Sequence, residues 1–101
     1  MNFHGNSKQS LNKQHLYVIY DIEENDIFKY GISDKPIRKD GYSKRMREQV
    51  DLLNRAVGWS RYFAIILIQN IFGREEALDI EDIHIKEYRA KYGRNPRGNV
   101  E

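Results

Sequence analysis

Glu81 falls on a helix face that should be buried, and a charged side chain in that position suggests a chemical role. In a helix over residues 74–92, Leu78, Glu81 and Ile85 recur at heptad spacing, and the glutamate lies in the middle of the apolar arc. A carboxylate is costly there unless it is paired or binds a cation. Glu81 is therefore a candidate metal ligand, and the alternative is a buried ion pair with an arginine.

Arg45 and Gln49 show the same anomaly one helix earlier. They lie one turn apart, between Leu52 and Met46, on the arc that should face the core. An arginine and a glutamate on the inner arcs of two helices are expected to face one shared cleft. The alternatives are that Arg45 simply pairs with the glutamate, or that it extends outward to solvent.

Tyrosine and lysine side chains on two predicted strands could complete such a cleft. Tyr17 and Tyr20 lie on opposite faces of the first strand, because side chains alternate along a strand. Lys29 and Tyr30 oppose each other in the same way on the second strand. A tyrosine on a strand usually packs in the core or at its rim, so these residues gain a chemical meaning only beside the arginine and the glutamate.

The elements that must position these side chains begin with a hairpin. Residues 16–22 (LYVIYDI) and 27–33 (IFKYGIS) are rich in β-branched and aromatic residues, which favours strands. The polar turn between them predicts an antiparallel pair. Residues 34–41 contain a proline and a glycine and are expected to form a loop.

Two helices and a third strand complete the predicted fold. Ser43 caps the first helix without a capping box, since Met46 occupies the third helical position, and Gly58 ends it. The continuous apolar run at residues 62–68 is typical of a central strand covered on both faces. Residues 74–92 form the second helix. The order β-β-α-β-α predicts an α+β domain with a three-stranded, mainly antiparallel sheet flanked by helices.

The composition excludes several kinds of chemistry. A chain of 101 residues suits one domain, and we expect residues 1–14, which are polar, to be a leader or linker before a domain at 15–101. The absence of cysteine excludes disulfides, thiolate zinc sites and a thiol nucleophile. The three histidines lack metal-ligand spacing, so any metal has to be a hard cation held by oxygen.

The distribution of charge is more informative than the net charge of +2. Basic residues crowd two stretches, which could meet in space to follow phosphates, although ordinary solvated faces are the alternative. The candidate nucleic-acid-binding residues are Lys35, Arg38, Lys39, Lys44 and Arg47. No apolar run reaches the roughly 18 residues that a membrane span needs, and the first 14 residues lack a signal-peptide core.

Several segments together resemble the GIY-YIG (URI) nuclease superfamily over residues 15–99. They are the hairpin LYVIYDIEENDIFKYGIS, the helix SKRMREQVDLLN and the segment LDIEDIHIKEY. Within the superfamily, FKYGIS, GREEAL and GRNPRGN look most similar to the C-terminal nuclease domains of bacterial polymorphic toxins, and FHGNSKQS resembles the junction before them. The resemblance implies secretion as part of a larger toxin, activity in the target-cell cytoplasm and a cognate immunity protein.

The resemblance also implies roles for individual residues. HLY falls on the first family motif, so Tyr17 resembles the tyrosine that helps to activate water. KYG falls on the second, so Lys29 stands where most members have tyrosine, and Tyr30 packs. Arg45 matches the arginine that grips the scissile phosphate, and Gln49 replaces a histidine or tyrosine one turn later.

Two later residues complete the implied site. Glu81 matches the metal-binding glutamate, and Asn99 resembles the late asparagine that supports the site. The candidate catalytic residues are therefore Tyr17, Lys29, Tyr30, Arg45, Gln49, Glu81 and Asn99. Because His15, Lys29 and Gln49 depart from the family pattern, the acceptor of the water proton stays open between Tyr17 and Lys29.

These residues suit phosphodiester hydrolysis. An arginine can donate two parallel hydrogen bonds to phosphate, and one carboxylate can hold a single Mg²⁺ or Mn²⁺ ion that keeps most of its waters. The residues and the resemblance therefore predict a metal-dependent endonuclease. We favour DNA over RNA as the substrate, but no base-reading motif in the sequence chooses between them. The alternatives are a nucleic-acid-binding module without catalysis and a protein-interaction module on the same fold.

Overall fold

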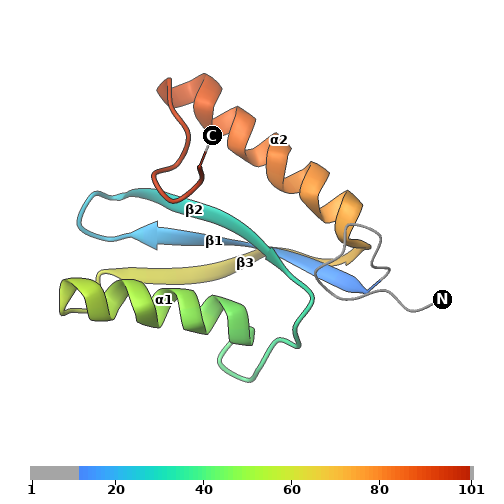
Figure 1. The fold of residues 1–101 in the computed structure, drawn as a ribbon, viewed down its shortest axis with the longest axis horizontal. Coiled ribbons are helices and arrows are strands. Elements are labelled where there is room, and N and C mark those ends of the chain that lie inside the picture. Colours follow the sequence, from blue (N-terminus) through green and yellow to red (C-terminus); the bar gives the residue numbers. More distant parts are fainter. Residues whose placement is uncertain (1–11, 101) are drawn as a thin grey trace.

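The computed structural model describes residues 12–100 and contains five elements in the predicted order (Figure 1). They are β1 (Lys13–Asp21), β2 (Asp26–Ser33), α1 (Lys44–Val57), β3 (Tyr62–Phe72) and α2 (Arg74–Tyr92). The predicted α+β architecture with a three-stranded sheet is confirmed, and every strand pair is antiparallel. Within residues 12–100, neither helix has the length and apolar character to span a bilayer.

The strand order is β2-β1-β3, so the prediction that residues 62–68 form a central strand was wrong. The central strand is β1, whose residues 16–19 are fully buried. β3 lies at an edge and extends to Phe72, and alternate side chains on one of its faces are at least 40% exposed: Phe63, Ile65 and Leu67. An apolar run does not distinguish an edge strand from a central one, because periodicity alone does not show whether both faces are covered.

The two helices cover opposite faces of the sheet (Figure 1). The core under α1 contains Tyr17, Ile19, Met46, Val50, Tyr62 and Ala64. The core under α2 contains Leu16, Val18, Tyr30, Ile32, Ile71, Ala77 and Tyr88. β1 contributes to both cores because its side chains alternate between the two faces. A side chain from α1 can therefore meet one from α2 only around an edge of the sheet.

The start of α1 is held by side-chain contacts to its cap. Ser43 has the extended backbone of an N-cap, and its Oγ lies 2.9 Å from Nε2 of the buried His15 on β1. The exclusion of a capping box was wrong, since the Ser43 N–H donates to the Met46 sulfur at 3.5 Å and a thioether takes the place of the usual glutamate. At the other end, Gly58 adopts a left-handed conformation with φ 82° and stops the helix.

β1 begins before the boundary that composition predicts for the domain. Gln14 pairs with Ile71 of β3 and is only 1% exposed, so it belongs to the sheet and not to a leader. Composition does not reveal this burial, because the glutamine is covered by the unexpectedly long end of β3. Residues 1–11 of the expected leader lie outside the described residues.

The irregular segment after α2 folds back onto β2 (Figure 1). The Gly98 N–H donates to the Phe28 carbonyl at 2.7 Å. The Asn99 carboxamide accepts from the Tyr30 N–H at 2.9 Å and donates to the Tyr30 carbonyl at 3.0 Å, as a neighbouring strand would. These bonds place residues 98–100 along the outer edge of β2.

Candidate active site

The Tyr17 side chain lies across Gly31 of β2, so that its hydroxyl reaches the edge of that strand. The two residues pair in the β1–β2 ladder, and a Cβ atom at Gly31 would overlap the Cζ and Oη atoms of Tyr17. Glycine is needed at this position because the tyrosine ring lies directly against the backbone. The glycine of the KYG motif therefore serves to place the Tyr17 hydroxyl.

A pocket of about 290 Å³ opens at the same edge and gathers five of the candidate catalytic residues. They come from five different segments: Tyr17 from β1, Lys29 from β2, Arg45 from α1, Glu81 from α2 and Asn99 from the C-terminal segment. Because α1 and α2 lie on opposite faces, their side chains meet here around β2. The rest of the lining consists of Gly31, Ile32, Arg74, Leu78, Gly98 and Val100.

The Glu81 carboxylate is half-buried, and no ion pair within 4.0 Å joins it to a cation of residues 12–100. Burial raises the pKa of this carboxyl, while the charges of Lys29, Arg74 and Arg45 act against that rise, in decreasing order. The glutamate is therefore surrounded by positive charge but neutralised by no single partner. The alternative in which it forms a direct ion pair with Arg45 does not hold in the described part of the chain.

Arg45 lies at the rim of the pocket and is exposed, which corrects its placement on a buried arc. The helix face that was expected to be buried included Leu52, but this side chain is 65% exposed. The only buried side chains of α1 are those of Met46 and Val50. The apolar residues of this helix are spread more widely than the sheet surface that it covers. Arg45 thus extends to solvent beside the pocket, where an incoming ligand can reach it.

Gln49 does not line the pocket but fixes the group that does. The Tyr17 hydroxyl donates to Gln49 Oε1 at 2.5 Å. Burial raises the pKa of Tyr17, with Arg45 acting in the opposite direction through its charge and a hydrogen bond. Burial lowers the pKa of Lys29, and repulsion from Arg45 adds to this effect while Glu81 opposes it. The tyrosine therefore holds its proton, and the lysine is moved toward the neutral amine.

Tyr30 is not brought to the pocket. Its side chain is 7% exposed in the core under α2, with its ring centroid 5.4 Å from that of His84. This is the packing position that the resemblance assigns to it. Its backbone still serves the site, because it anchors Asn99.

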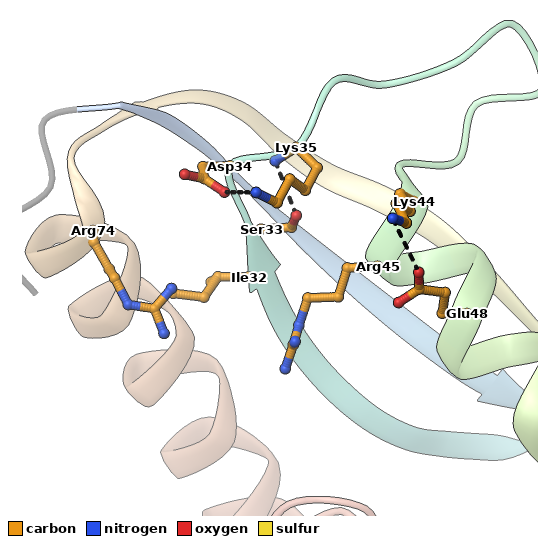
Figure 2. Close-up of a pocket in the computed structure, with 8 residues that line it drawn as sticks. All are labelled: Ile32, Ser33, Asp34, Lys35, Lys44, Arg45, Glu48 and Arg74. Carbon is orange, nitrogen blue, oxygen red and sulfur yellow. Dashed lines mark hydrogen bonds and ion pairs between the residues drawn. The ribbon is translucent and has the colours of Figure 1, made fainter. Parts of the chain in front are cut away.

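The predicted nucleic-acid-binding residues divide into two groups. Lys35 and Lys44 line a second hollow of about 400 Å³ that adjoins the pocket (Figure 2). Arg38 and Lys39 are exposed in the loop before α1 and line neither hollow. Arg47 pairs with Asp40 at 2.7 Å and borders a separate hollow beside Trp59.

Arg74 is a pocket residue that the sequence interpretation missed. It is half-buried at the first position of α2 and lines both the pocket and the adjoining hollow. One signal was available in the sequence: a cation in the first turn of a helix opposes the helix dipole, in contrast to the Glu75 and Glu76 that follow.

The donor set limits which metal the pocket fits. Glu81 is the one carboxylate in its lining, and residues 12–100 contain no group of three or more acidic or histidine side chains placed to hold an ion. Mg²⁺ is commonly bound by one or two carboxylates together with water and substrate phosphates. One carboxylate among several cations is therefore compatible with a single hard divalent cation, and the lining residues do not supply the several carboxylates of a two-metal centre.

Comparison with known proteins identifies the family. A family model described as URI fold toxin 2 matches residues 7–93, which include all five elements. No curated protein and no solved structure matches the chain. Because the matched region contains the entire sheet and both helices, this chain belongs to the URI fold toxin 2 family.

Proposed function

We propose that this chain is a metal-dependent endonuclease that hydrolyses phosphodiester bonds of nucleic acid, with DNA favoured over RNA. One observation carries the proposal: side chains from five segments meet in a pocket whose single carboxylate has no ion-pair partner in residues 12–100. Buried charges that serve only the fold are normally paired, so an unpaired one in a pocket points to a ligand.

Arg45 is suited to hold the scissile phosphate. Its guanidinium is exposed at the rim of the pocket and can donate two parallel hydrogen bonds to phosphate oxygens. The positive charge of Arg45 favours the transition state, in which negative charge increases on the phosphate oxygens.

Tyr17 is suited to position the attacking water. Its proton is directed at Gln49, and Arg45 also forms a hydrogen bond with the hydroxyl. One lone pair of the hydroxyl oxygen is left to accept a hydrogen bond from a water that enters the pocket beside this otherwise enclosed side chain. The water oxygen bonds to phosphorus as the bond to the leaving oxygen breaks. The water proton passes to Lys29 as a neutral amine, either directly or by a relay in which Tyr17 takes it up and releases its own proton to Lys29, and the leaving oxygen takes up a proton from solvent.

Glu81 would hold the metal ion in this scheme. A bound Mg²⁺ or Mn²⁺ supplies charge that neutralises the phosphate group during the reaction. The Glu81 carboxylate itself needs to be ionised to bind a cation, and the charges of Lys29, Arg74 and Arg45 favour that state. Asn99 holds the C-terminal segment against β2 and so maintains one wall of the pocket.

Membership of a toxin family supports a role in killing or arresting a target cell. We infer delivery as the C-terminal part of a larger secreted toxin, action in the cytoplasm of the target cell, and neutralisation by a cognate immunity protein that blocks the pocket. Expression of the wild-type chain alone in a bacterial cytoplasm is expected to stop growth. Healthy growth with abundant wild-type protein and no partner would contradict the toxic role.

Digestion of purified nucleic acid tests the enzymatic role directly. Plasmid DNA and total RNA are incubated separately with the purified chain, with Mg²⁺ or with EDTA. We expect cleavage of at least one substrate with Mg²⁺, DNA more readily than RNA, and none with EDTA. Binding of nucleic acid without cleavage under any divalent metal would favour the non-catalytic module instead.

A further inference from the structure

The hollow beside the candidate active site is continuous with it. Its volume is about 400 Å³, and it shares Ile32, Arg45 and Arg74 with the pocket. Figure 2 shows Arg45 extending from α1 and Arg74 from α2 on either side of Ile32. The two guanidinium groups therefore lie at the junction of the two hollows, which is where a chain passing from one to the other would run.

The positive charge of the hollow is unevenly compensated. Lys35 lies 3.9 Å from Asp34, and Lys44 lies 3.8 Å from Glu48, so each lysine has a carboxylate at hand. Neither arginine has a carboxylate within 4.0 Å among residues 12–100. The lining carries four basic and two acidic side chains, and its uncompensated charge resides on the arginines.

The position of Arg74 carries two energetic costs that no ion pair offsets among residues 12–100. A cation at the first position of a helix is disfavoured by the helix dipole, and the side chain is half-buried, which adds a desolvation cost. Its charge acts on Glu81 without forming an ion pair. A second anion bound in the hollow would offset both costs, and a phosphodiester is the anion that a nuclease substrate supplies next to the scissile one.

We propose that the hollow of 400 Å³ is a subsite for the phosphate adjacent to the scissile phosphate on the same strand, and that Arg74 binds it. The inference rests on the proposed nuclease function. The substrate strand then runs from the pocket between Arg45 and Arg74 toward Lys35 and Lys44. Arg74 is a binding residue for an unreactive group, so its loss weakens substrate binding more than the chemical step.

Removal of single charges from the substrate tests this subsite. Short DNA strands, with matched RNA strands in parallel, carry one neutral methylphosphonate at successive positions around the cleaved bond. When the methylphosphonate replaces the phosphate that Arg74 binds, the wild-type KM should rise about tenfold, because one charged hydrogen bond is lost. The kcat should stay within about threefold of its value for the unmodified strand. Equal KM values for every neighbouring position would overturn the subsite.

The Arg74→Gln variant makes the test specific. The KM of this variant for the unmodified strand should be about tenfold higher than that of the wild type. Because the arginine is absent, the methylphosphonate should change the KM of the variant by less than about twofold. Arg74→Lys should restore part of the binding. Arg55→Gln removes a charge from the last turn of α1, outside both hollows, and serves as the matched control with unchanged kinetics. An Arg74→Gln variant as sensitive as the wild type to the methylphosphonate would refute the assignment.

Binding measurements separate failure of the subsite from failure of the proposed function. Fluorescence anisotropy reports the affinity of the same strands whether or not they are cleaved. If the wild type cleaves no strand but Arg74→Gln binds about tenfold more weakly and Arg55→Gln does not, the phosphate-binding role of Arg74 stands and the nuclease proposal fails. If cleavage proceeds and neither change affects KM or affinity, the nuclease proposal stands and the subsite is wrong.

Discussion

Asp21 at the end of β1 has a fully buried carboxylate that two arginines neutralise, whereas the half-buried Glu81 of α2 has no ion-pair partner in residues 12–100. Arg61 donates to both Asp21 oxygens at 2.8 Å, and Arg97 donates at 2.6 Å. These hydrogen bonds, led by those of Arg61, hold the pKa of the Asp21 carboxyl well below its usual range. Burial instead raises the pKa of Glu81.

The difference separates a structural charge from one that we propose to be functional. The ion pairs of Asp21 with Arg61 and Arg97 connect the end of β1, the residue before β3 and the C-terminal segment. The Asp21 charge is therefore neutralised within the fold. Within residues 12–100, Glu81 has no ion-pair partner, although the charges of Lys29, Arg74 and Arg45 act on it from a distance. A buried carboxylate in this state costs stability, and we attribute its presence to a ligand.

The largest effect on folding is expected at Asp21. Asp21→Asn removes the carboxylate and leaves two arginines partly stranded, which should lower the free energy of unfolding by about 3 kcal/mol or more in urea titrations. Glu24→Gln is the matched control, because Glu24 is exposed and 3.9 Å from Arg61, and it should change little. An Asp21→Asn protein as stable as the wild type would remove one side of the comparison.

The stabilities contributed by Asp21 and Glu81 are expected to respond to pH in opposite directions. The folded-state pKa of Asp21 is lowered, so its stabilisation is present above the ordinary carboxyl pKa and is lost as the pH falls through the lowered value. The gap between the wild type and Asp21→Asn should therefore narrow in acid. The folded-state pKa of Glu81 is raised, so acid should favour the wild type relative to Glu81→Gln.

The next effect concerns catalysis and not the fold. Arg45→Lys keeps the charge but loses the planar fork, so turnover should fall by about 100-fold or more. The thermal midpoint should hardly change, because Arg45 is exposed. Arg55→Lys on the same helix is the control for a general loss of arginine. Unchanged turnover in Arg45→Lys would show that Arg45 does not contact the phosphate.

A smaller effect on folding is expected at Gly31. Gly31→Ala places a Cβ against the Tyr17 ring, which should cost about 1–3 kcal/mol and displace the hydroxyl from Gln49. In the double variant Gly31→Ala/Tyr17→Leu, stability should recover while cleavage stays low. If the double variant recovered both stability and cleavage, Tyr17 would have no part in the reaction.

Sequence patterns predicted the order of the elements, and together with the family resemblance they predicted five of the residues that line the pocket, but not the way in which these residues meet. The β-branched strands and the heptad pattern of α2 identify local structure, because both periodicities are local. The edge position of β3 and the return of Asn99 onto β2 depend on contacts between distant residues, to which no local pattern responds.

The errors about β3 and Arg45 share a physical origin. Apolar residues on α1 and β3 exceed what the opposing surfaces cover, so Leu52 and Phe63 are exposed and the neighbouring Arg45 is not buried. Arg74 was overlooked because one basic residue among many carries no signal by itself. Its location against the helix dipole becomes informative only when the hollow beside it is known.

Glu81→Gln is the most direct test of the comparison, because its expected effect on folding is the smallest and its expected effect on cleavage is complete. Thermal melts and nucleic-acid digestion with Mg²⁺ are run on the same preparations of wild type and variant. We expect no detectable cleavage and a midpoint equal to or slightly above that of the wild type, since an amide is easier to bury than a charge. Loss of about 3–5 kcal/mol of stability would instead identify Glu81 as a structural partner, and a stable, fully active variant would contradict the proposed site.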